Sequence, residues 1–193
     1  MDHKEAEALV SAAIRDSIQV KDTVLGTMVP LITRVADIIS KSIASGGKLI
    51  LFGNGGSAGD AQHIAAELLG RFEQERRAFP AIALTTNSST LTAIGNDYGY
   101  DHIFSRQVEG LANTGDVVIG ISTSGNSPNV VSAIRMAQKK GAITVGMTGE
   151  KGGLLASECA HCLKVPSSTT ARIQESHIMI GHLLCLIIER NLC

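Results

Sequence analysis

Two loops that contain glycine and serine have the composition of an anion-binding site. The first runs from Phe52 to Ser57 and the second from Ile121 to Ser127, and each follows a short apolar run and opens a helical pattern. Glycine lets the backbone approach a ligand closely, while serine hydroxyls and the unpaired N–H groups of a helix start point at one spot. Ser127 is a suitable N-cap, and Pro128 occupies the expected first helical position. These loops predict a phosphorylated small molecule as the ligand.

A histidine and a carboxylate with helical spacing follow the first loop. His63 and Glu67 are four residues apart, so on a helix their side chains share a face and can converge on a metal ion or a substrate. A simple surface contact is the commoner outcome for such a pair. Its position just after an anion loop favours a functional role, because parallel-sheet proteins bind ligands at the carboxyl ends of their strands.

The last helical pattern carries polar residues in an otherwise apolar stretch, namely Gln174, Glu175, His177 and His182. A single histidine among isoleucines and leucines can simply be a hydrogen-bonded core residue. Gln174 and His182 are separated by about 12 Å along a helix axis. Their joint action would require long side-chain reaches, a late helix start or contributions from two subunits.

The candidate site residues lie in a chain in which helical patterns alternate with short apolar runs, and these elements must position them. The first 45 residues have helical periodicity, with Pro30 expected to start a second helix and Gly46 and Gly47 to end it. The apolar runs are Leu49 to Phe52, Ala81 to Leu84, Val117 to Ile121, Ile143 to Met147 and Cys162 to Val165. A final amphipathic helix is expected from about Thr170 to Arg190. This alternation predicts an α/β fold, with a parallel sheet covered by helices on both faces.

Length and charge limit the class of protein. The 193 residues suit one domain, 1–193, and contain no linker or repeat. Lys and Arg number 17 against 18 Asp and Glu, so no broad field favours nucleic acid or an anionic membrane. The charged start does not resemble a secretory signal, and no apolar stretch is long enough to span a bilayer, so we expect a cytoplasmic protein. The helical pair in 1–46 has more apolar surface than one sheet face needs, which suggests packing between subunits.

Two other motifs have weaker functional interpretations. Cys159 and Cys162 could form a metal knuckle or a redox pair, but no second pair completes a zinc site, and 160–165 predicts a buried strand. We therefore expect core thiols. Gly53 to Ala58 satisfies a dinucleotide fingerprint, yet the acidic residue expected after the second strand is missing, and no Walker lysine is present. Nucleotide chemistry is therefore disfavoured.

Five sequence blocks and the paired N-terminal helices carry a resemblance to a known family. The blocks are GNGGSAGDAQHIAAELLGRF, TAIGNDYGYDHIFSRQV, GDVVIGISTSGNSPNVVSAI, TGEKGG and ARIQESHIMIGHLLCLIIE. They are similar to the sugar isomerase (SIS) domain family, and within it to the bacterial phosphoheptose isomerases. The resemblance implies a three-layer, flavodoxin-like sandwich with a five-stranded parallel sheet. It also implies one zinc ion per subunit and a homotetramer with active sites near subunit contacts.

The activity that this resemblance implies is an aldose–ketose isomerisation. Sedoheptulose 7-phosphate, a phosphorylated seven-carbon sugar, would become D-glycero-D-manno-heptose 7-phosphate through an enediol, for surface glycans such as lipopolysaccharide. Glu67 and His182 are the expected acid and base. The implied zinc ligands are His63, Glu67, Gln174 and His182. The implied substrate contacts, besides Glu67 and Gln174, are Asn54, Gly55, Gly56, Ser57, Arg71, Asn96, Asp97, Ser122, Thr123, Ser124 and Ser127.

One relative within the family offers an alternative function. This relative is a SIS protein that binds the replication initiator DnaA and is not an enzyme. It shares with this chain short sequence segments such as RFE-x-ER, PAIAL, LTAI and ARIQE. The presence here of both Glu67 and His182 favours the enzyme. Ala171 replaces an aspartate common just before RIQE in the isomerases, which leaves the substrate contacts at that edge open. A phosphosugar of another chain length is a third possibility, because pocket depth cannot be predicted from the sequence.

Overall fold

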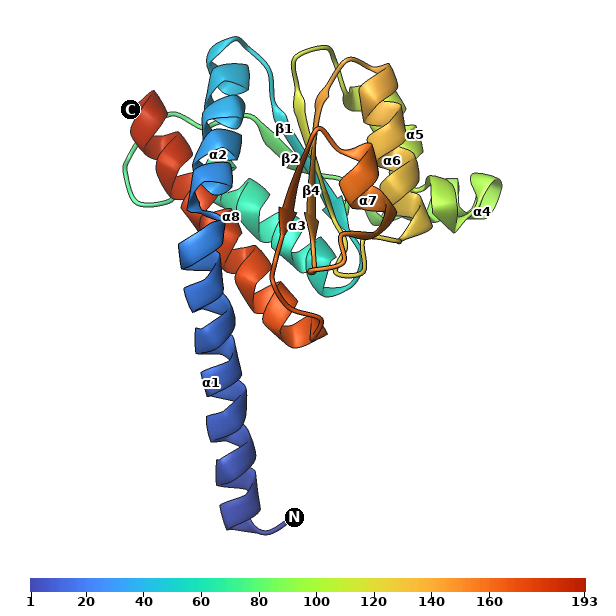
Figure 1. The fold of residues 1–193 in the computed structure, drawn as a ribbon. Helices are drawn as coiled ribbons and strands as arrows, with labels where there is room; N and C mark the ends of the chain where they lie inside the picture. Colours follow the sequence, from blue (N-terminus) through green and yellow to red (C-terminus); the bar gives the residue numbers. More distant parts are fainter.

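Five parallel strands form one sheet in the order β2-β1-β3-β4-β5 in the computed structural model, which describes residues 1–193 (Figure 1). The strands are β1 (Leu49–Gly53), β2 (Ala81–Ala83), β3 (Val117–Ile121), β4 (Ile143–Thr148) and β5 (His161–Lys164). The five predicted runs are therefore confirmed, with small shifts at their ends. The strand order reverses between β1 and β3, and in such sheets ligands bind in the crevice at the carboxyl ends of the two strands. Both predicted anion loops start there.

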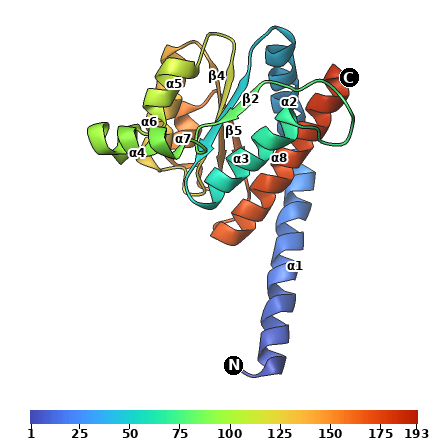
Figure 2. The same ribbon diagram turned by 180° about the vertical axis from the view of Figure 1, so that it is seen from behind.

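Helices cover both faces of the sheet, as predicted (Figures 1 and 2). One layer contains α2 (Val29–Ala44), α3 (Gly56–Leu69) and α8 (Thr170–Leu192). The other contains α5 (Ser105–Leu111), α6 (Pro128–Lys139) and α7 (Gly153–Glu158), with α4 (Ser88–Tyr98) and the short helix η1 (Tyr100–His102) at its side. Leu49 and Leu51 of β1 belong to the first apolar core, whereas Ile50 and Phe52 belong to the second. Both faces of β1 are buried, which explains its continuous apolar run.

The strand β5 is half exposed, so the prediction of a buried strand at 160–165 is wrong. It pairs only with β4, and Leu163 is its one buried residue, because an edge strand is covered on fewer sides. Cys159 and Cys162 are partly buried free thiols rather than full core residues. Burial, together with the nearby Cys162 and Glu158, raises the pKa of Cys159 to about 12. This thiol therefore stays protonated at neutral pH.

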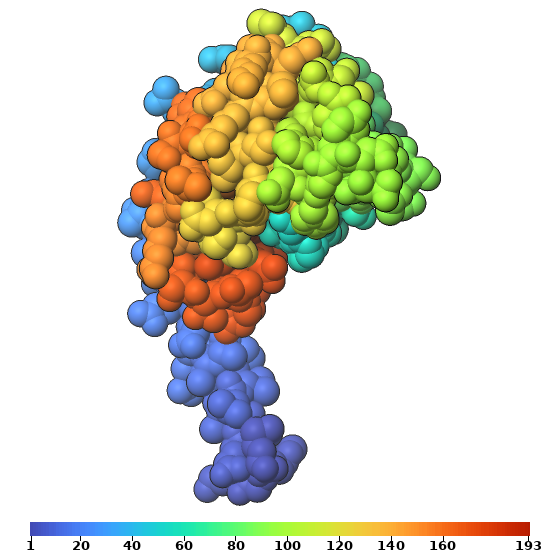
Figure 3. Space-filling model, turned by 90° about the vertical axis from the view of Figure 1, so that its right-hand side faces the viewer, coloured from blue at the N-terminus to red at the C-terminus, as the bar shows by residue number.

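The N-terminal helices have different surroundings. α2 begins next to Pro30 and packs Ile32, Val35 and Ile39 into the core. α1 (His3–Thr27) instead projects from the body as a long stalk, visible in Figure 3, and Val24 is its only buried residue. Arg172 on α8 donates to the carbonyl oxygen of Ala13 at 2.5 Å and so anchors one side of α1.

The excess apolar surface predicted for the N-terminal region lies on α1. Leu9, Val10, Ile14 and Ile18 are each exposed by 56% or more, and their spacing places them along one stripe. No single helix of the chain is long and apolar enough to cross a membrane, and α1 and α2 meet the same test only together, across a bend of 71°.

Candidate active site

The first loop presents an unpaired backbone donor at the start of α3. Gly55 is the N-cap residue, and its φ of +57° is a conformation that favours glycine. It has no side chain to cap the helix. The N–H groups of Ser57 and Ala58 already donate to the carbonyl oxygens of Asn54 and Gly55, so in the first turn only the N–H group of Gly56 stays available to a ligand. A Cβ atom at Gly53 would lie 2.7 Å from the Cβ of the buried Ser57, so only glycine allows this tight strand-to-helix turn. The binding of an anion by this loop stays a prediction.

The second loop gathers three hydroxyl groups beside the start of α6. Ser122 Oγ lies 2.9 Å from Ser127 Oγ and 3.4 Å from Ser124 Oγ. Ser127 is the N-cap residue, as predicted, but its side chain makes no capping hydrogen bond because it faces Ser122. Pro128 has no N–H group, and those of Val130 and Val131 already donate to the carbonyl oxygen of Ser127. The three hydroxyls and the N–H group of Asn129 are therefore what this loop offers to an anion such as a phosphate.

A reciprocal pair of amides joins the two loops, and no sequence pattern indicates it. Asn54 Nδ2 donates to Asn129 Oδ1 at 2.9 Å, and Asn129 Nδ2 donates to Asn54 Oδ1 at 2.9 Å. Tyr100 Oη also donates to Asn54 Oδ1, at 3.1 Å. Asn129 is buried in the first turn of α6. The Asn54 side chain thus fixes the crevice, and its carbonyl oxygen already accepts two hydrogen bonds.

Gly125 gives the second loop its shape, and its replacement by alanine is expected to destabilise the protein. Gly125 has a φ of +69°, and a Cβ atom there would overlap the carbonyl oxygen of Gly152. Strain and overpacking together should lower the free energy of unfolding by about 2–4 kcal/mol. Chemical denaturation measures this change. Gly110→Ala is the control, because nothing lies near that position in α5; an equal loss of stability in both variants would contradict the expectation.

Three potential metal ligands converge between α3 and α8. His63 Nε2 lies 3.1 Å from Glu67 Oε1 and 2.9 Å from His182 Nε2. Ligand atoms of all three residues lie within 4.8 Å of one another. Two ligands that each lie about 2.0–2.1 Å from a tetrahedral zinc ion are themselves ~3.3 Å apart. The spacing and the donor types, two imidazoles and one carboxylate, therefore fit a catalytic zinc site.

Close packing of two parallel helices brings these residues together. Gly181 on α8 lies against Ile64 on α3, and a Cβ atom at Gly181 would come within 2.6 Å of Ile64 Cδ1. One residue later on α8, His182 therefore faces His63. The side chain of His63 is 50% exposed and that of Glu67 is 25% exposed, so the cluster is open on one side. A substrate can reach it from there.

Gln174 lies in the same interface but further back along the helices. A Cβ atom at Gly56 would lie 2.5 Å from Gln174 Nε2, which places this amide at the start of α3. No hydrogen bond joins Gln174 to His63, Glu67 or His182. α8 already begins at Thr170, so a late helix start does not solve the spacing. Gln174 could therefore reach the metal ion of this cluster only through a long side-chain reach, or it would act in a site that two subunits share.

Three predicted substrate contacts are exposed and lie apart from the cluster. Asn96 and Asp97 are on α4, where the Asn96 amide donates to Asp97 Oδ1 at 2.8 Å. Arg71 follows α3 and lies 3.9 Å from Glu75. No hydrogen bond or ion pair connects these three residues to either loop within this chain. Their roles stay predictions.

His177 is a core residue, which confirms the simpler interpretation for this histidine. It is fully buried, and its Nε2 lies 3.2 Å from the carbonyl oxygen of Thr148, while Nδ1 has no partner. Burial lowers the pKa of His177 to about 4, against a smaller opposing effect of the Thr148 carbonyl. The folded protein thus resists protonation of this ring.

We expect His177 to make the fold less stable in acid. The unfolded chain takes up a proton on this residue below about pH 6.5, whereas the folded chain does so only near pH 4. The contribution of His177 to the free energy of unfolding is therefore fully present above pH 6.5. It is lost as the pH falls toward 4, which lowers the free energy of unfolding by on the order of 3 kcal/mol. Unfolding free energies of the wild type and His177→Gln should converge across this range. If the free energies of unfolding of the two proteins instead changed in parallel with pH, the His177 ring would not be the cause of the acid sensitivity.

Two residues near the cluster had no signal in the sequence. Asp60 precedes His63 by one helical turn, its Oδ2 atom is buried without a hydrogen-bond partner, and burial raises its pKa to about 6, partly offset by His63. The ring of Phe72 lies 5.7 Å from the ring of His182 and covers one side of it. Both shape the surroundings of the candidate metal ligands.

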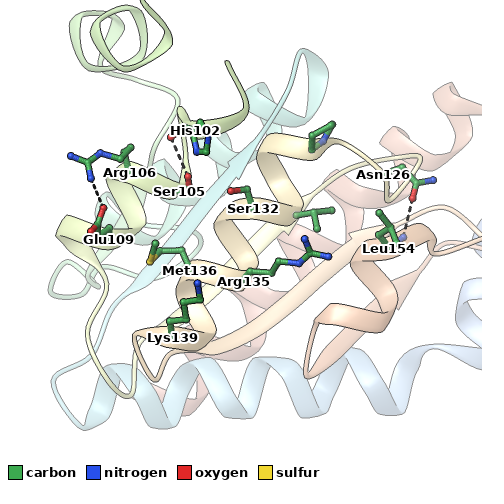
Figure 4. Close-up of a pocket in the computed structure, with 12 residues that line it drawn as sticks. His102, Ser105, Arg106, Glu109, Asn126, Ser132, Arg135, Met136, Lys139 and Leu154 are labelled. Atoms are coloured by element: carbon green, nitrogen blue, oxygen red, sulfur yellow. Dashed lines mark hydrogen bonds and ion pairs between the residues drawn. The ribbon is translucent and has the colours of Figure 1, made fainter. Parts of the chain in front are cut away.

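Cavities lie beside both loops, and a third, between α5 and α6, also reaches the second loop at Asn126. One of about 370 Å³ borders Asn54 and Tyr100, and one of about 200 Å³ borders Ser124. A cavity of about 410 Å³ lies between α5 and α6 (Figure 4). Arg106 and Arg135 line the α5–α6 cavity, but each is already paired with a glutamate, at 2.7 and 2.6 Å, so we assign it no ligand.

Comparisons with known proteins identify the family of this chain. Residues 14–149 match the SIS domain family. The phosphoheptose isomerase of Rhodospirillum rubrum is 54% identical over 88% of this chain and 90% of its own length. That of a Roseiflexus species is 55% identical over 93% of this chain and 91% of its own length. The structure of the phosphoheptose isomerase from Neisseria gonorrhoeae superposes with a TM-score of 0.91 at 42% identity, covering 96% of this chain and 99% of that one. The chain therefore belongs to the SIS domain family and, within it, to the phosphoheptose isomerases, which are aldose–ketose isomerases.

Proposed function

We propose that this protein converts sedoheptulose 7-phosphate into D-glycero-D-manno-heptose 7-phosphate. The observation that carries the proposal is the convergence of His63, Glu67 and His182 on α3 and α8, in a chain whose two loops at the carboxyl edge of the sheet offer hydroxyl and N–H groups to an anion. The identity of 50–55% to phosphoheptose isomerases over most of the chain supports the same reaction. The comparisons do not support the alternative of a protein that binds DnaA. Surface glycans such as lipopolysaccharide would use the product.

The reaction moves one proton between two neighbouring carbons through an enediol. In our proposal the Glu67 carboxylate takes the proton from C1 of the ketose and returns it at C2. The His182 imidazole moves a proton between the two sugar oxygens, because a histidine ring has one nitrogen that can donate and one that can accept a proton. Both side chains come from adjacent helices whose spacing is fixed by close packing at Gly181.

We propose zinc as the metal of this site, with His63, Glu67, Gln174 and His182 as its ligands. The convergence of the two imidazoles and the carboxylate supports this choice. Zinc bound there would polarise the sugar oxygens and so make the proton on carbon easier to remove.

The loops anchor the far end of the substrate. The Ser122–Ser127 loop, with Ser122, Thr123, Ser124 and Ser127, would hold the phosphate, and Asn54 to Ser57 would contact the sugar. Binding energy at the distant phosphate can hold the reacting carbons in register with Glu67 and His182. We propose Arg71, Asn96 and Asp97 as further contacts.

A homotetramer would complete this arrangement. The exposed apolar stripe of α1 supports subunit association, since a monomer would leave Leu9, Val10, Ile14 and Ile18 in water. The open side of the cluster and the exposed positions of Arg71 and Asp97 are compatible with contributions from a neighbouring subunit. Sedimentation equilibrium would measure the number of subunits.

The test of the proposed function is an isomerase assay on the purified protein. Incubation with sedoheptulose 7-phosphate should give the aldose heptose 7-phosphate, detected by nuclear magnetic resonance of the anomeric protons. Fructose 6-phosphate and ribulose 5-phosphate tested in parallel would define the preferred chain length. A pull-down with DnaA is run beside the assay. Binding of DnaA without any isomerisation would reject the proposal in favour of the scaffold.

A further inference from the structure

A buried ion pair connects α8 to the segment that follows α3. Glu189 on α8 is fully buried, and the Arg76 side chain is 3% exposed. Arg76 Nε donates to Glu189 Oε1 at 2.9 Å, and the guanidinium also stacks over the ring of Phe79 at 4.1 Å. Neither side chain is placed to contact the sugar, so the pair requires another explanation.

Glu189 holds three consecutive backbone donors of that segment. The N–H groups of Phe72, Glu73 and Gln74 donate to its carboxylate at 3.3, 2.9 and 3.0 Å. Burial alone would raise the pKa of Glu189, but these N–H groups and Arg76 outweigh it and hold the pKa below its ordinary value. The carboxylate is therefore ionised, and it fixes the path of the chain at Phe72.

Arg76 caps the end of α3. Its Nη2 donates to the carbonyl oxygen of Glu67 at 2.9 Å, and its Nη1 donates to that of Leu68 at 2.9 Å. The last carbonyl groups of a helix lack partners within the helix and carry its negative dipole end, so a cation there is favourable. Arg76 thus binds the same helical turn that carries the Glu67 side chain.

The ion pair reaches both members of the candidate acid/base pair. Glu67 is bound through its own carbonyl oxygen. His182 precedes Glu189 by two turns on the same face of α8. The ring of Phe72 covers the ring of His182, and the N–H group of Phe72 donates to the Glu189 carboxylate. The position of Glu67 relative to His182 along the two helix axes therefore depends on how Arg76 and Glu189 connect α3 to α8.

We propose that Arg76 and Glu189 are positioning residues that set the register of α3 against α8, and with it the geometry of Glu67 and His182. Buried ion pairs are often no more stabilising than apolar residues of the same size, so stability alone is a weak reason for this pair. Its hydrogen bonds instead define one axial position of two helices. The inference rests on the proposed function for the roles of Glu67 and His182 and for the zinc site to which they belong.

Glu189→Gln tests this inference with little change of shape. The new amide group faces donors on Arg76 and the backbone, so the connection loosens. The outer shell of a metal site typically affects affinity or activity by roughly 10–100-fold. We expect the zinc dissociation constant of the apoprotein to rise and kcat to fall within that range. KM should stay nearly unchanged, because the phosphate loop is untouched. Competition with a chromophoric chelator measures the zinc affinity.

Asp116→Asn is the matched control, since it weakens another ion pair, in which the carboxylate is buried and the lysine is partly exposed. Lys48 Nζ lies 2.7 Å from Asp116 Oδ2, and the Asp116 carboxylate also accepts the N–H groups of Lys48 and Asn113 at 2.9 and 2.8 Å. This pair lies at the amino ends of β1 and β3, and no hydrogen bond or ion pair joins it to α3 or α8. We expect Asp116→Asn to lower Tm but to leave zinc affinity and kcat as in the wild type.

Arg76→Lys provides a second variant, because lysine keeps the charge but cannot make all the guanidinium bonds. It decides the question by the same readouts if Glu189→Gln fails to fold. Weakened zinc binding and a fall in kcat would support the proposal. If either folded variant lowers Tm but keeps wild-type zinc affinity and kcat, the pair is merely structural and the proposal is overturned. A wild-type protein without isomerase activity would reject the proposed function, whereas the zinc affinities would still decide the role of the pair.

Discussion

Glu67→Gln is expected to reduce kcat for the isomerisation by about 10²–10⁴-fold, the usual contribution of a positioned acid or base. An amide keeps the size of the side chain but cannot take a proton from carbon. The phosphate would still bind the loop from Ser122 to Ser127, so the dissociation constant for the phosphosugar should change little. Steady-state kinetics and calorimetry of ligand binding separate these two effects.

The same result is expected for His182→Gln, because the two side chains act on one proton-transfer sequence. Glu109→Gln is the control, since Glu109 is a half-exposed carboxylate on α5 that pairs only with Arg106. It should retain wild-type kinetics. Near-normal turnover in either Glu67→Gln or His182→Gln would remove that residue from the mechanism.

His63→Ala is expected to abolish stoichiometric zinc binding and most of the activity. Loss of an outer-shell partner already weakens a metal site by roughly 10–100-fold, and loss of a direct ligand should weaken it at least as much. Elemental analysis should give one zinc ion per wild-type chain. Treatment with a chelator should remove the activity, and added zinc should restore it. Full activity in metal-free protein would defeat the assignment.

His3→Ala is an unusually close control for this experiment. His3 and Glu7 have the same four-residue spacing as His63 and Glu67, and His3 Nε2 lies 3.3 Å from Glu7 Oε1. No third ligand joins them, and His3 is almost fully exposed on α1. His3→Ala should therefore leave both zinc content and activity unchanged.

These two histidine–glutamate pairs also show how far the sequence could predict the site. Spacing alone makes them equivalent. The anion loop before His63 favours that pair, because the helix that carries it starts at the carboxyl end of a strand. The approach of His182 depends on the packing of Gly181 against Ile64, which are 117 residues apart in sequence. No local pattern contains that contact, and here the family resemblance supplied what spacing could not.

The sequence predicts the strands and helices better than it predicts how deeply their residues are buried. Runs such as Val117 to Ile121 are apolar on both faces, so strand, parallel pairing and covering helices follow from one pattern. The exposure of β5 depends instead on its position at the sheet edge. The Asn54–Asn129 amide pair and the Arg76–Glu189 ion pair were missed because polar residues in helices and loops usually face solvent. Their burial follows from tertiary contacts.

The most direct measurement is a crystal structure of the zinc-loaded protein with a reduced heptitol 7-phosphate, which binds but cannot isomerise. Our account predicts the phosphate on the Ser122–Ser127 loop, an anomalous zinc peak beside His63, and the C1–C2 end of the ligand within hydrogen-bond reach of both Glu67 and His182. A ligand whose C1–C2 end lies in another cavity, out of reach of either side chain in every subunit, would contradict it.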